Sequence, residues 1–565
     1  MRKIVAAVAA VGVVAGIVGS APTVVASQEP IVWGPCTHPA LIVRGAECGK
    51  LEVPLNHADP AGAKIRLAVS RIKATVPPEQ YQGVMLTNPG GPGGAGLAMA
   101  VLGDRVPKGA GKGYDWVGLD VRGVGASEPA LSCDSGYFTY NRPYYVPVSR
   151  ELEQTWLDRS KGYAKACGAA GGDLLGHLRT VDTVRDLDLL RAALGQEKIN
   201  FYGYSYGSYL GQVYSTLHPD RVGRMVLDGV VDPRSIWYQS NLNQDVAFDR
   251  NIKIYFDWLA KHDGAYHLGT DGRAIEAGYY ADLDKLRQTP AGGVIGPDEL
   301  ADVFLRAAYF VHVWTDLGSA YAQYRATGDV FGIKAIWDGL NSRQPGSDNS
   351  FAVYLGVQCT DVRWPTNWDR WRADNWRIHA IAPFETWNNA WYNAPCVYWT
   401  ARPGTPVEVD GSKAPPILLI NETLDGATPF EGALEVRDRF PNSALIEGVG
   451  GTTHSASLFG NLCVDNQVAD YLASGTLPDR RPGRGSDTQC DPFPQPTPPA
   501  GPAREDARVL MERSADDDRA LAHTTGGRNA KSGPKAQVRL PHARHTSHVG
   551  DLTKLLSGNK AARRR

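Results

Sequence analysis

The sequence predicts an α/β protein in which a mainly parallel sheet is interrupted by one large, mainly helical insertion. Short apolar strands alternate with helical segments up to about residue 233, and the alternation resumes at residue 417, as is typical of parallel sheets with crossover helices. The stretch 234–410 has helical patterning and contains most of the 14 tryptophans. Ligands of open α/β folds bind beyond the carboxyl ends of the strands, so we expect the insertion to form a cap over that edge. A separately packed domain is the alternative.

The first 26 residues have the pattern of a secretory signal peptide. Arg2 and Lys3 precede an apolar run over residues 4–18, and small residues follow before Ser27. The run is shorter than the roughly 20 residues of a membrane-spanning helix. We therefore expect a secreted protein without a stable membrane anchor.

The eight cysteines agree with export, because an even number of cysteines in an exported protein is typical of a disulfide framework. The simplest pairing joins sequence neighbours, namely Cys36 with Cys48, Cys133 with Cys167, Cys359 with Cys396, and Cys463 with Cys490. No Cys and His cluster has the spacing of a metal site. We expect neither a metal nor an organic cofactor.

The strands and helices of the sheet can be placed in order along the chain. The expected strands cover 50–54, 65–70, 84–87, 116–120, 199–202, 225–228, 417–420 and 444–447. Apolar residues recur at helical spacing over 180–194, and another helix is expected over 206–218. We assign residues 27–233 and 411–494 to two parts of one core, and residues 234–410 to the cap.

Residues 495–565 form a tail of different composition. The tail begins with a proline-rich stretch, and residues 503–565 contain 14 Lys and Arg against 7 Asp and Glu. We expect this basic tail to be disordered, because so polar a segment buries too little apolar surface to fold. The formal net charge of -1 gives no indication of a nucleic-acid partner, and we expect none.

The pentapeptide Gly203-Tyr-Ser-Tyr-Gly207 has the G-x-S-x-G pattern of a serine nucleophile. The pattern alone is weak, since a chain of this length contains about one match by chance. Its position between an expected strand and an expected helix is that of the nucleophile elbow in the α/β-hydrolase fold. We predict this fold, with Ser205 at a helix N-terminus, where backbone N–H groups favour developing negative charge.

A serine hydroxyl needs a base, and in this fold the acid and then the histidine follow the serine along the chain. Asp425 follows the strand at 417–420, and Glu422 is the rival acid, closer to the strand end. His454 is the only histidine between Asp425 and the tail, and it lies in a glycine-rich loop after the next strand. We predict the catalytic triad Ser205, Asp425 and His454.

The oxyanion hole of such a site needs two backbone N–H donors. One is expected from Tyr206, directly after the nucleophile. The other is expected from the glycine-rich segment 88–96, at Gly90 or Gly91, and we choose Gly91. A phosphate-binding loop is the alternative for this segment, but the segment lacks the lysine of a P-loop.

Three motifs carry a resemblance to a known family: Pro89-Gly-Gly-Pro-Gly93, Asp120-Val-Arg-Gly-Val-Gly-Ala-Ser127 and Gly203-Tyr-Ser-Tyr-Gly207. Together they resemble the prolyl-aminopeptidase family of α/β-hydrolase serine peptidases, and most closely its secreted bacterial tripeptidyl aminopeptidases. Residues 421–429 and 462–475 are similar to the carboxyl-terminal region of those enzymes. Pro89 stands where many relatives have histidine.

The resemblance implies a serine exopeptidase that acts on peptides with a free amino terminus and releases short units such as tripeptides. A substrate of this kind needs an acidic anchor for its ammonium group. The candidates in the insertion are Asp361, Asp369, Asp374 and Glu385, and for each of them a solvated surface position is the alternative.

Two other functions use the same scaffold. An esterase or lipase would use the same triad, because ester and amide hydrolysis share the same tetrahedral chemistry. A non-catalytic surface binding protein would not need Ser205, Asp425 and His454 together, so the complete set argues against it.

Overall fold

The computed structural model describes residues 31–342 and 344–498, so the signal peptide and nearly all of the tail predicted above lie outside the described residues. A ten-stranded sheet in the order β1-β2-β3-β5-β4-β6-β7-β8-β9-β10 runs through this part of the chain. The strands are β1 (Gly34–Pro35), β2 (Glu47–Pro54), β3 (Lys64–Ile72), β4 (Val84–Asn88), β5 (Asp115–Asp120), β6 (Ile199–Tyr204), β7 (Val222–Asp228), β8 (Ile417–Glu422), β9 (Ser443–Gly448) and β10 (Thr488–Cys490).

The sheet has an antiparallel edge and a parallel remainder. β1, β2, β3 and β5 pair antiparallel in that order, whereas every neighbouring pair from β5 through β4 and β6 to β10 is parallel. The eight strands expected from the sequence are all present, which confirms the α/β prediction. β1 and β10 were not predicted, because two or three residues are too few for a pattern to be visible.

Alternate residues of the central strands enter two separate cores, because successive side chains of a strand point to opposite faces. In β8, Ile417 and Leu419 belong to the buried cluster on one face, whereas Leu418 and Ile420 belong to the cluster on the other. The near-continuous apolar sequence of β8 is the expected result for a parallel strand covered on both faces.

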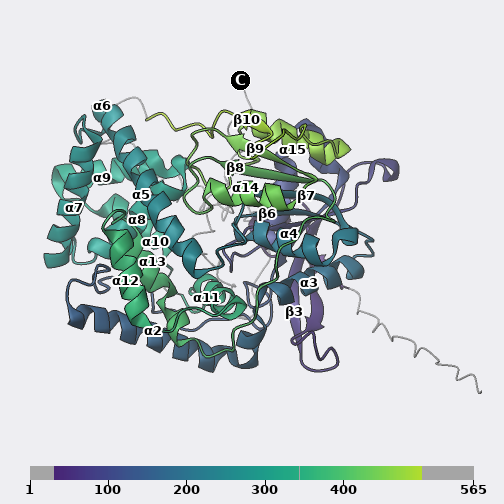
Figure 1. Ribbon diagram of the computed structural model, residues 1–565, viewed down its shortest axis with the longest axis horizontal. Coiled ribbons are helices and arrows are strands. Elements are labelled where there is room, and N and C mark those ends of the chain that lie inside the picture. Colours follow the sequence, from purple (N-terminus) through teal and green to yellow (C-terminus); the bar gives the residue numbers. More distant parts are fainter. Residues whose placement is uncertain (1–30, 343, 499–565) are drawn as a thin grey trace, which may run out of the picture.

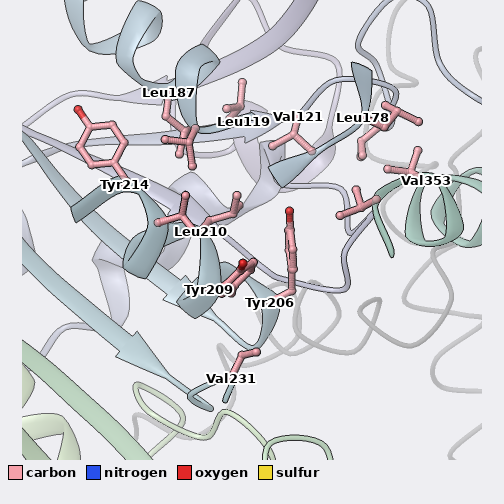
Figure 2. Packing of buried hydrophobic residues seen from close by; sticks show 14 of the residues in the cluster. Leu119, Val121, Leu178, Leu187, Tyr206, Tyr209, Leu210, Tyr214, Val231 and Val353 are labelled. Atoms are coloured by element: carbon pink, nitrogen blue, oxygen red, sulfur yellow. The ribbon is translucent and has the colours of Figure 1, made fainter. Parts of the chain in front are cut away.

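Helices cover both faces of the sheet. On the first face lie α3 (Thr180–Ala193) and α4 (Tyr206–Leu217), and Figure 2 shows Leu187 of α3 beside Leu210 of α4 and near Leu119 of β5. The second face is covered by α15 (Leu462–Ser474), while α14 (Phe430–Arg439) connects β8 to β9. α4 begins directly after Ser205, so its packing fixes the position of the nucleophile.

The helical cap lies to one side of the sheet (Figure 1) and has a buried cluster of its own, in which Trp314 and Trp337 are fully buried. Its helices are α5 (Tyr238–Lys261), α6 (Asp263–Tyr266), α7 (Gly272–Gln288), α8 (Pro297–Tyr309), α9 (Trp314–Thr327), α10 (Phe331–Leu340), α11 (Asn349–Asp361), α12 (Trp368–His379) and α13 (Thr386–Asn393). The earlier helix α2 (Arg150–Gly171) also packs here, since Trp156 stacks on Trp391 with ring centroids 5.6 Å apart.

Four disulfides join the cysteines that are neighbours in the sequence, as expected: Cys36–Cys48, Cys133–Cys167, Cys359–Cys396 and Cys463–Cys490. The third disulfide ties α11 to the turn after α13 and so closes a loop inside the cap. None of the helices in the described part of the chain is long and apolar enough to cross a membrane.

The double substitution Cys359→Ala/Cys396→Ala should destabilise the protein by about 3 to 4 kcal/mol, because the disulfide closes a long loop and restricts the unfolded chain. The 37-residue separation exceeds the 12 residues of Cys36–Cys48, so the equivalent Cys36→Ala/Cys48→Ala variant should lose about 1 kcal/mol less. Urea unfolding of both variants without reductant measures these losses. A larger loss for the short loop would contradict the argument.

Candidate active site

Ser205 occupies a sharp turn between β6 and α4. Its backbone has a φ of 56° and a ψ of -124°, a conformation that non-glycine residues rarely adopt and that is typical of a strained nucleophile elbow. A Cβ atom at Gly203 would lie 2.4 Å from the carbonyl oxygen of Gly207, so the turn requires glycine there. The N–H of Ser205 donates to the carbonyl oxygen of Asp228, at the end of β7, at 2.8 Å.

Asp425 and His454 form a hydrogen-bonded pair in the loops that follow β8 and β9. Nδ1 of His454 lies 2.7 Å from Oδ2 of Asp425, and both side chains are buried. Oδ1 of Asp425 accepts the N–H groups of Ala427 and Thr428 at 2.8 and 2.9 Å, and the Thr428 hydroxyl donates to Oδ2 at 2.8 Å. These bonds fix the carboxylate toward the ring, so that Nδ1 carries the proton and Nε2 is the available base.

The end of β7 contacts both Ser205 and His454. A Cβ atom at Gly229, the residue after β7, would lie 2.9 Å from Cε1 of His454, and the preceding residue accepts the N–H of Ser205. Ser205 and His454 both line one cavity of about 290 Å³, whose walls come from the sheet edge and the cap. Nε2 of His454 lies 3.4 Å from the Ser455 hydroxyl. The bond between Ser205 and His454 in the proposed triad is expected to tighten when substrate binds, as catalytic hydrogen bonds of free enzymes often do.

The two residues expected to supply the oxyanion hole both lie at the cavity. Tyr206 and Gly91 line the cavity beside Ser205. Gly90 lies against the elbow, since a Cβ atom on it would be 2.8 Å from Cβ of Ser205, but its N–H donates to Oδ1 of Asn88 at 2.9 Å. This geometry favours Gly91 over Gly90 as the second donor.

Asp120 connects the glycine-rich loop to the second sequence motif. Its Oδ1 accepts the N–H groups of Gly96 and Leu97 at 2.7 and 3.1 Å, and its Oδ2 accepts the N–H of Ala126 at 2.8 Å. The motif that begins at Asp120 therefore shapes the loop that carries Gly91.

Tyr206 is fixed through its side chain. Figure 2 shows its ring among the buried residues of the first core. Its hydroxyl forms a 2.8 Å hydrogen bond with the Thr180 hydroxyl, which donates to Oδ2 of Asp361 at 2.6 Å. Asp361, a candidate ammonium anchor from the sequence, thus supports the nucleophile elbow instead.

Glu422, the rival catalytic acid, binds backbone. Its Oε2 accepts the N–H of Thr453, directly before His454, and its Oε1 accepts the N–H of Phe493, both at 2.6 Å. Burial raises the pKa of Glu422 to about 8, against the opposing effect of these two N–H donors. Glu422 therefore positions the histidine loop, while Asp425 contacts the ring.

Sequence reasoning missed several supporting groups. Asp228 accepts both the N–H and the hydroxyl of Ser457, at 2.8 and 2.5 Å, and so fixes the loop after His454. Burial raises the pKa of Asp228 to about 6. The position of Asp228 at the end of a parallel strand was a usable signal, but nothing in the sequence indicated Ser457. Thr428 lies three residues after Asp425, a spacing at which a hydroxyl or N–H commonly returns to an Asp side chain.

The cap wall of the cavity is acidic. Glu385 and Asp302 both line the cavity, and Glu385 is 5% exposed. Its carboxylate accepts a 3.3 Å hydrogen bond from Nδ2 of Asn388. Burial, together with the nearby carboxylates of Asp245 and Asp302, raises the pKa of Glu385 well above its usual range. A cation in this part of the cavity would relieve both effects.

The other two anchor candidates lie outside this wall. Asp369 pairs with Arg372 on α12 at 2.5 Å, and Asp374 pairs with Arg377 at 3.4 Å. Neither is among the residues that line the cavity. Of the four candidates, the structure brings only Glu385 to the site.

The sequence is similar to two protein families and to several known enzymes. The family described as alpha/beta hydrolase fold matches residues 83–269, and the family described as TAP-like protein matches residues 382–490. A tripeptidyl aminopeptidase of Streptomyces lividans is 39% identical over 84% of this chain and 89% of its own length. Serine protease Hip1 of Mycobacterium tuberculosis is 31% identical over 80% and 90%. Carboxylesterase B of the same species is 31% identical over 82% and 91%.

The substitution Glu422→Gln should flatten the pH dependence of stability. Because the pKa of Glu422 rises from its ordinary 4.5 to about 8 on folding, the folded protein retains a proton that the unfolded chain releases. The contribution is therefore complete below about pH 4.5 and is lost as the pH rises toward about 8. Thermal unfolding should show a steeper fall in melting temperature over this range for the wild type than for the variant. Parallel curves would contradict the assignment.

Proposed function

The chain belongs to the tripeptidyl aminopeptidase family of α/β-hydrolase serine peptidases, and we propose that it removes tripeptides from free amino termini with Ser205, His454 and Asp425 as its catalytic triad. The observation that carries this proposal is the Asp425–His454 hydrogen bond of 2.7 Å beside the cavity that Ser205 also lines. Membership of this family makes the chain a serine exopeptidase. The identity of its catalytic residues and the release of tripeptides are what we propose.

Acylation begins when His454 Nε2 takes the proton of the Ser205 hydroxyl and Oγ attacks the scissile carbonyl carbon. The N–H groups of Tyr206 and Gly91 donate to the oxyanion of the tetrahedral intermediate. His454 then gives its proton to the leaving amine, and the amino-terminal unit remains as an ester on Ser205. Asp425 stabilises the imidazolium throughout without accepting the proton.

Deacylation repeats these steps with water. His454 removes a proton from the water as it attacks the ester carbonyl, and the same two N–H groups stabilise the second oxyanion. Ser205 leaves with the proton from His454, and the released peptide carries a free carboxylate.

Glu385 is the proposed anchor for the substrate ammonium group. An ammonium ion would pair with this buried carboxylate, whereas the neighbouring Asp302 already pairs with Arg142 at 2.5 Å. The cavity volume of about 290 Å³ is near the lower end of the range for ligand sites, roughly 300 to 1,000 Å³. A small volume suits a short amino-terminal unit better than the middle of a chain.

The proposed place of action is outside the cell. Four disulfides are typical of proteins that fold in an oxidising compartment, and the predicted signal peptide supplies the route. Peptides are the proposed partners, in agreement with the peptidase relatives.

Hydrolysis of tripeptidyl arylamides with a free or acetylated amino group tests this function. The wild type should cleave the free substrate at least 100-fold faster than the acetylated one, and faster than mono- or dipeptidyl arylamides. Ser205→Ala should abolish activity, and Asp425→Asn should lower kcat by about 10⁴-fold. Activity in Ser205→Ala would overturn the triad. Preference for simple esters over every peptide would favour the esterase alternative.

The substitution Glu385→Gln should lower kcat/KM for free tripeptidyl substrates by roughly 10- to 100-fold, the value of a buried charged hydrogen bond, and leave slow cleavage of the acetylated substrate unchanged. Because burial raises the pKa of Glu385, this carboxyl takes up its proton at a higher pH than an ordinary glutamate as the pH falls. KM of the wild type should therefore rise as the pH falls, and the variant should lose this dependence. Asp374→Asn, on α12 outside the cavity lining, is the control. Equal losses with both substrates would exclude the anchor role.

A further inference from the structure

The cap contacts the catalytic histidine through the end of helix α8. The last carbonyl groups of a helix have no partner within the helix. At the end of α8, the carbonyl oxygen of Tyr309 accepts the backbone N–H of His454 at 2.9 Å. The N–H of Val311, just beyond, donates to the Thr453 hydroxyl at 3.3 Å. The histidine loop therefore binds the cap as well as the sheet.

The preceding carbonyl of the same helix binds Asn251 of α5. Nδ2 of Asn251 donates to the carbonyl oxygen of Ala308 at 3.1 Å and also to that of Leu424, directly before Asp425, at 2.9 Å. Both acceptors are carbonyls, so the side chain of Asn251 must turn its NH₂ group toward them; the Leu424 carbonyl also accepts Nη2 of Arg250 at 2.5 Å. Its Oδ1 accepts the Nε–H of Arg250 at 3.1 Å, which fixes this orientation. Asn251 is fully buried.

The acid loop also packs closely on α5. A Cβ atom at Gly426 would lie 2.6 Å from Cδ1 of Phe248 and 3.0 Å from Nδ2 of Asn251, so a larger residue would separate the loop from the helix. Nε2 of Gln244 donates to the carbonyl oxygen of Ala427 at 2.6 Å. Two loops of the core that are far apart in the sequence thus rest on one part of the cap.

We propose that Asn251 is a positioning residue that sets the distance and orientation between Asp425 and His454. Its two N–H bonds join the residue before Asp425 to the helix end that binds His454. With the Asp425–His454 hydrogen bond, they close a ring of contacts. The proposal rests on the triad assigned above and goes beyond it, because it makes the cap part of the catalytic apparatus rather than only a cover over the substrate.

Removal of Asn251 takes this donor from the Ala308 carbonyl and leaves the Leu424 carbonyl bonded to Nη2 of Arg250 at 2.5 Å. The acid loop then loses its link to the end of α8 and can shift relative to His454. A displacement of about 1 Å at a catalytic group costs on the order of 100-fold in rate. The substrate contacts at Glu385 lie elsewhere in the cavity, so the loss falls on kcat rather than on KM. Loss of a residue that merely supported folding would lower stability without a selective fall in kcat.

The test compares Asn251→Ala and Asn251→Asp with the wild type in the tripeptidyl arylamide assay. Asn251→Asp keeps the shape of the side chain but replaces the NH₂ donor by an oxygen. We expect kcat to fall by 10- to 100-fold in Asn251→Ala and at least as far in Asn251→Asp, with KM changed less than threefold. Labelling of Ser205 by a fluorophosphonate should slow by a similar factor.

Asn375→Ala is the matched control, because Asn375 is also a buried asparagine of the cap, but its Nδ2 donates to Trp371 within its own helix. This variant should lose stability and keep kcat. Thermal unfolding of each variant shows which of them remain folded at the assay temperature.

A double-substitution cycle separates positioning from general damage. In the Asp425→Asn background, Asn251→Ala should lower kcat by less than threefold further, since the bond it positions is already impaired. Full additivity, or a wild-type kcat in a folded Asn251→Ala protein, would overturn the proposal. If Ser205→Ala and Asp425→Asn remain active, the triad itself is wrong, and this outcome is distinct from a failure of Asn251 alone.

Discussion

The hydrogen bond between Asp425 and His454 is the contact on which the rest of the site depends. It joins two loops whose only covalent connection runs through α14 and β9. The parallel pairing of β8 with β9 brings both loops to one edge of the sheet. Burial makes the bond strong, since a charged acceptor in a low-dielectric site gains more from each donor than it would in water. The same burial makes each misplaced donor costly, which explains why so many backbone groups converge on Asp425 and on Glu422.

A second constraint is close approach of backbone segments around Ser205. The elbow, the glycine-rich loop and α11 meet with almost no space between them, as a Cβ atom at Gly93 would lie 2.3 Å from the carbonyl oxygen of Ser350. Glycine at these positions lets the proposed oxyanion donors, the proposed nucleophile Ser205 and the cap approach one another closely. The glycines of the first and third motifs are therefore a packing requirement of the site and not a sign of a loose loop.

The sequence was sufficient to predict those parts of the protein that a local pattern of residues determines. The strands of the sheet are apolar runs between turn residues, and Ser205, Asp425 and His454 each follow one of them, so the order of strands placed all three at the same edge. Residues whose partners lie far away in the sequence could not be predicted. Glu385 could not be chosen over Asp361 by spacing, because the choice depends on which carboxylate faces the cavity. Asn251 has no signature at all, since its partners at 308 and 424 are carbonyl groups that every residue carries.

Helix α8 contributes residues to the cavity at two levels along its length. Asp302, beside the proposed ammonium site, and Tyr309, whose carbonyl oxygen accepts the N–H of His454, are both on α8 and both line the cavity. Seven residues of helix at 1.5 Å each separate their levels by about 10 Å. An extended peptide advances by roughly 3.3 Å per residue, so this separation along α8 corresponds to the length of about three residues. Helix α8, bonded at one end to the loop of His454, therefore links the acidic wall of the cavity to the same contacts that position the proposed triad.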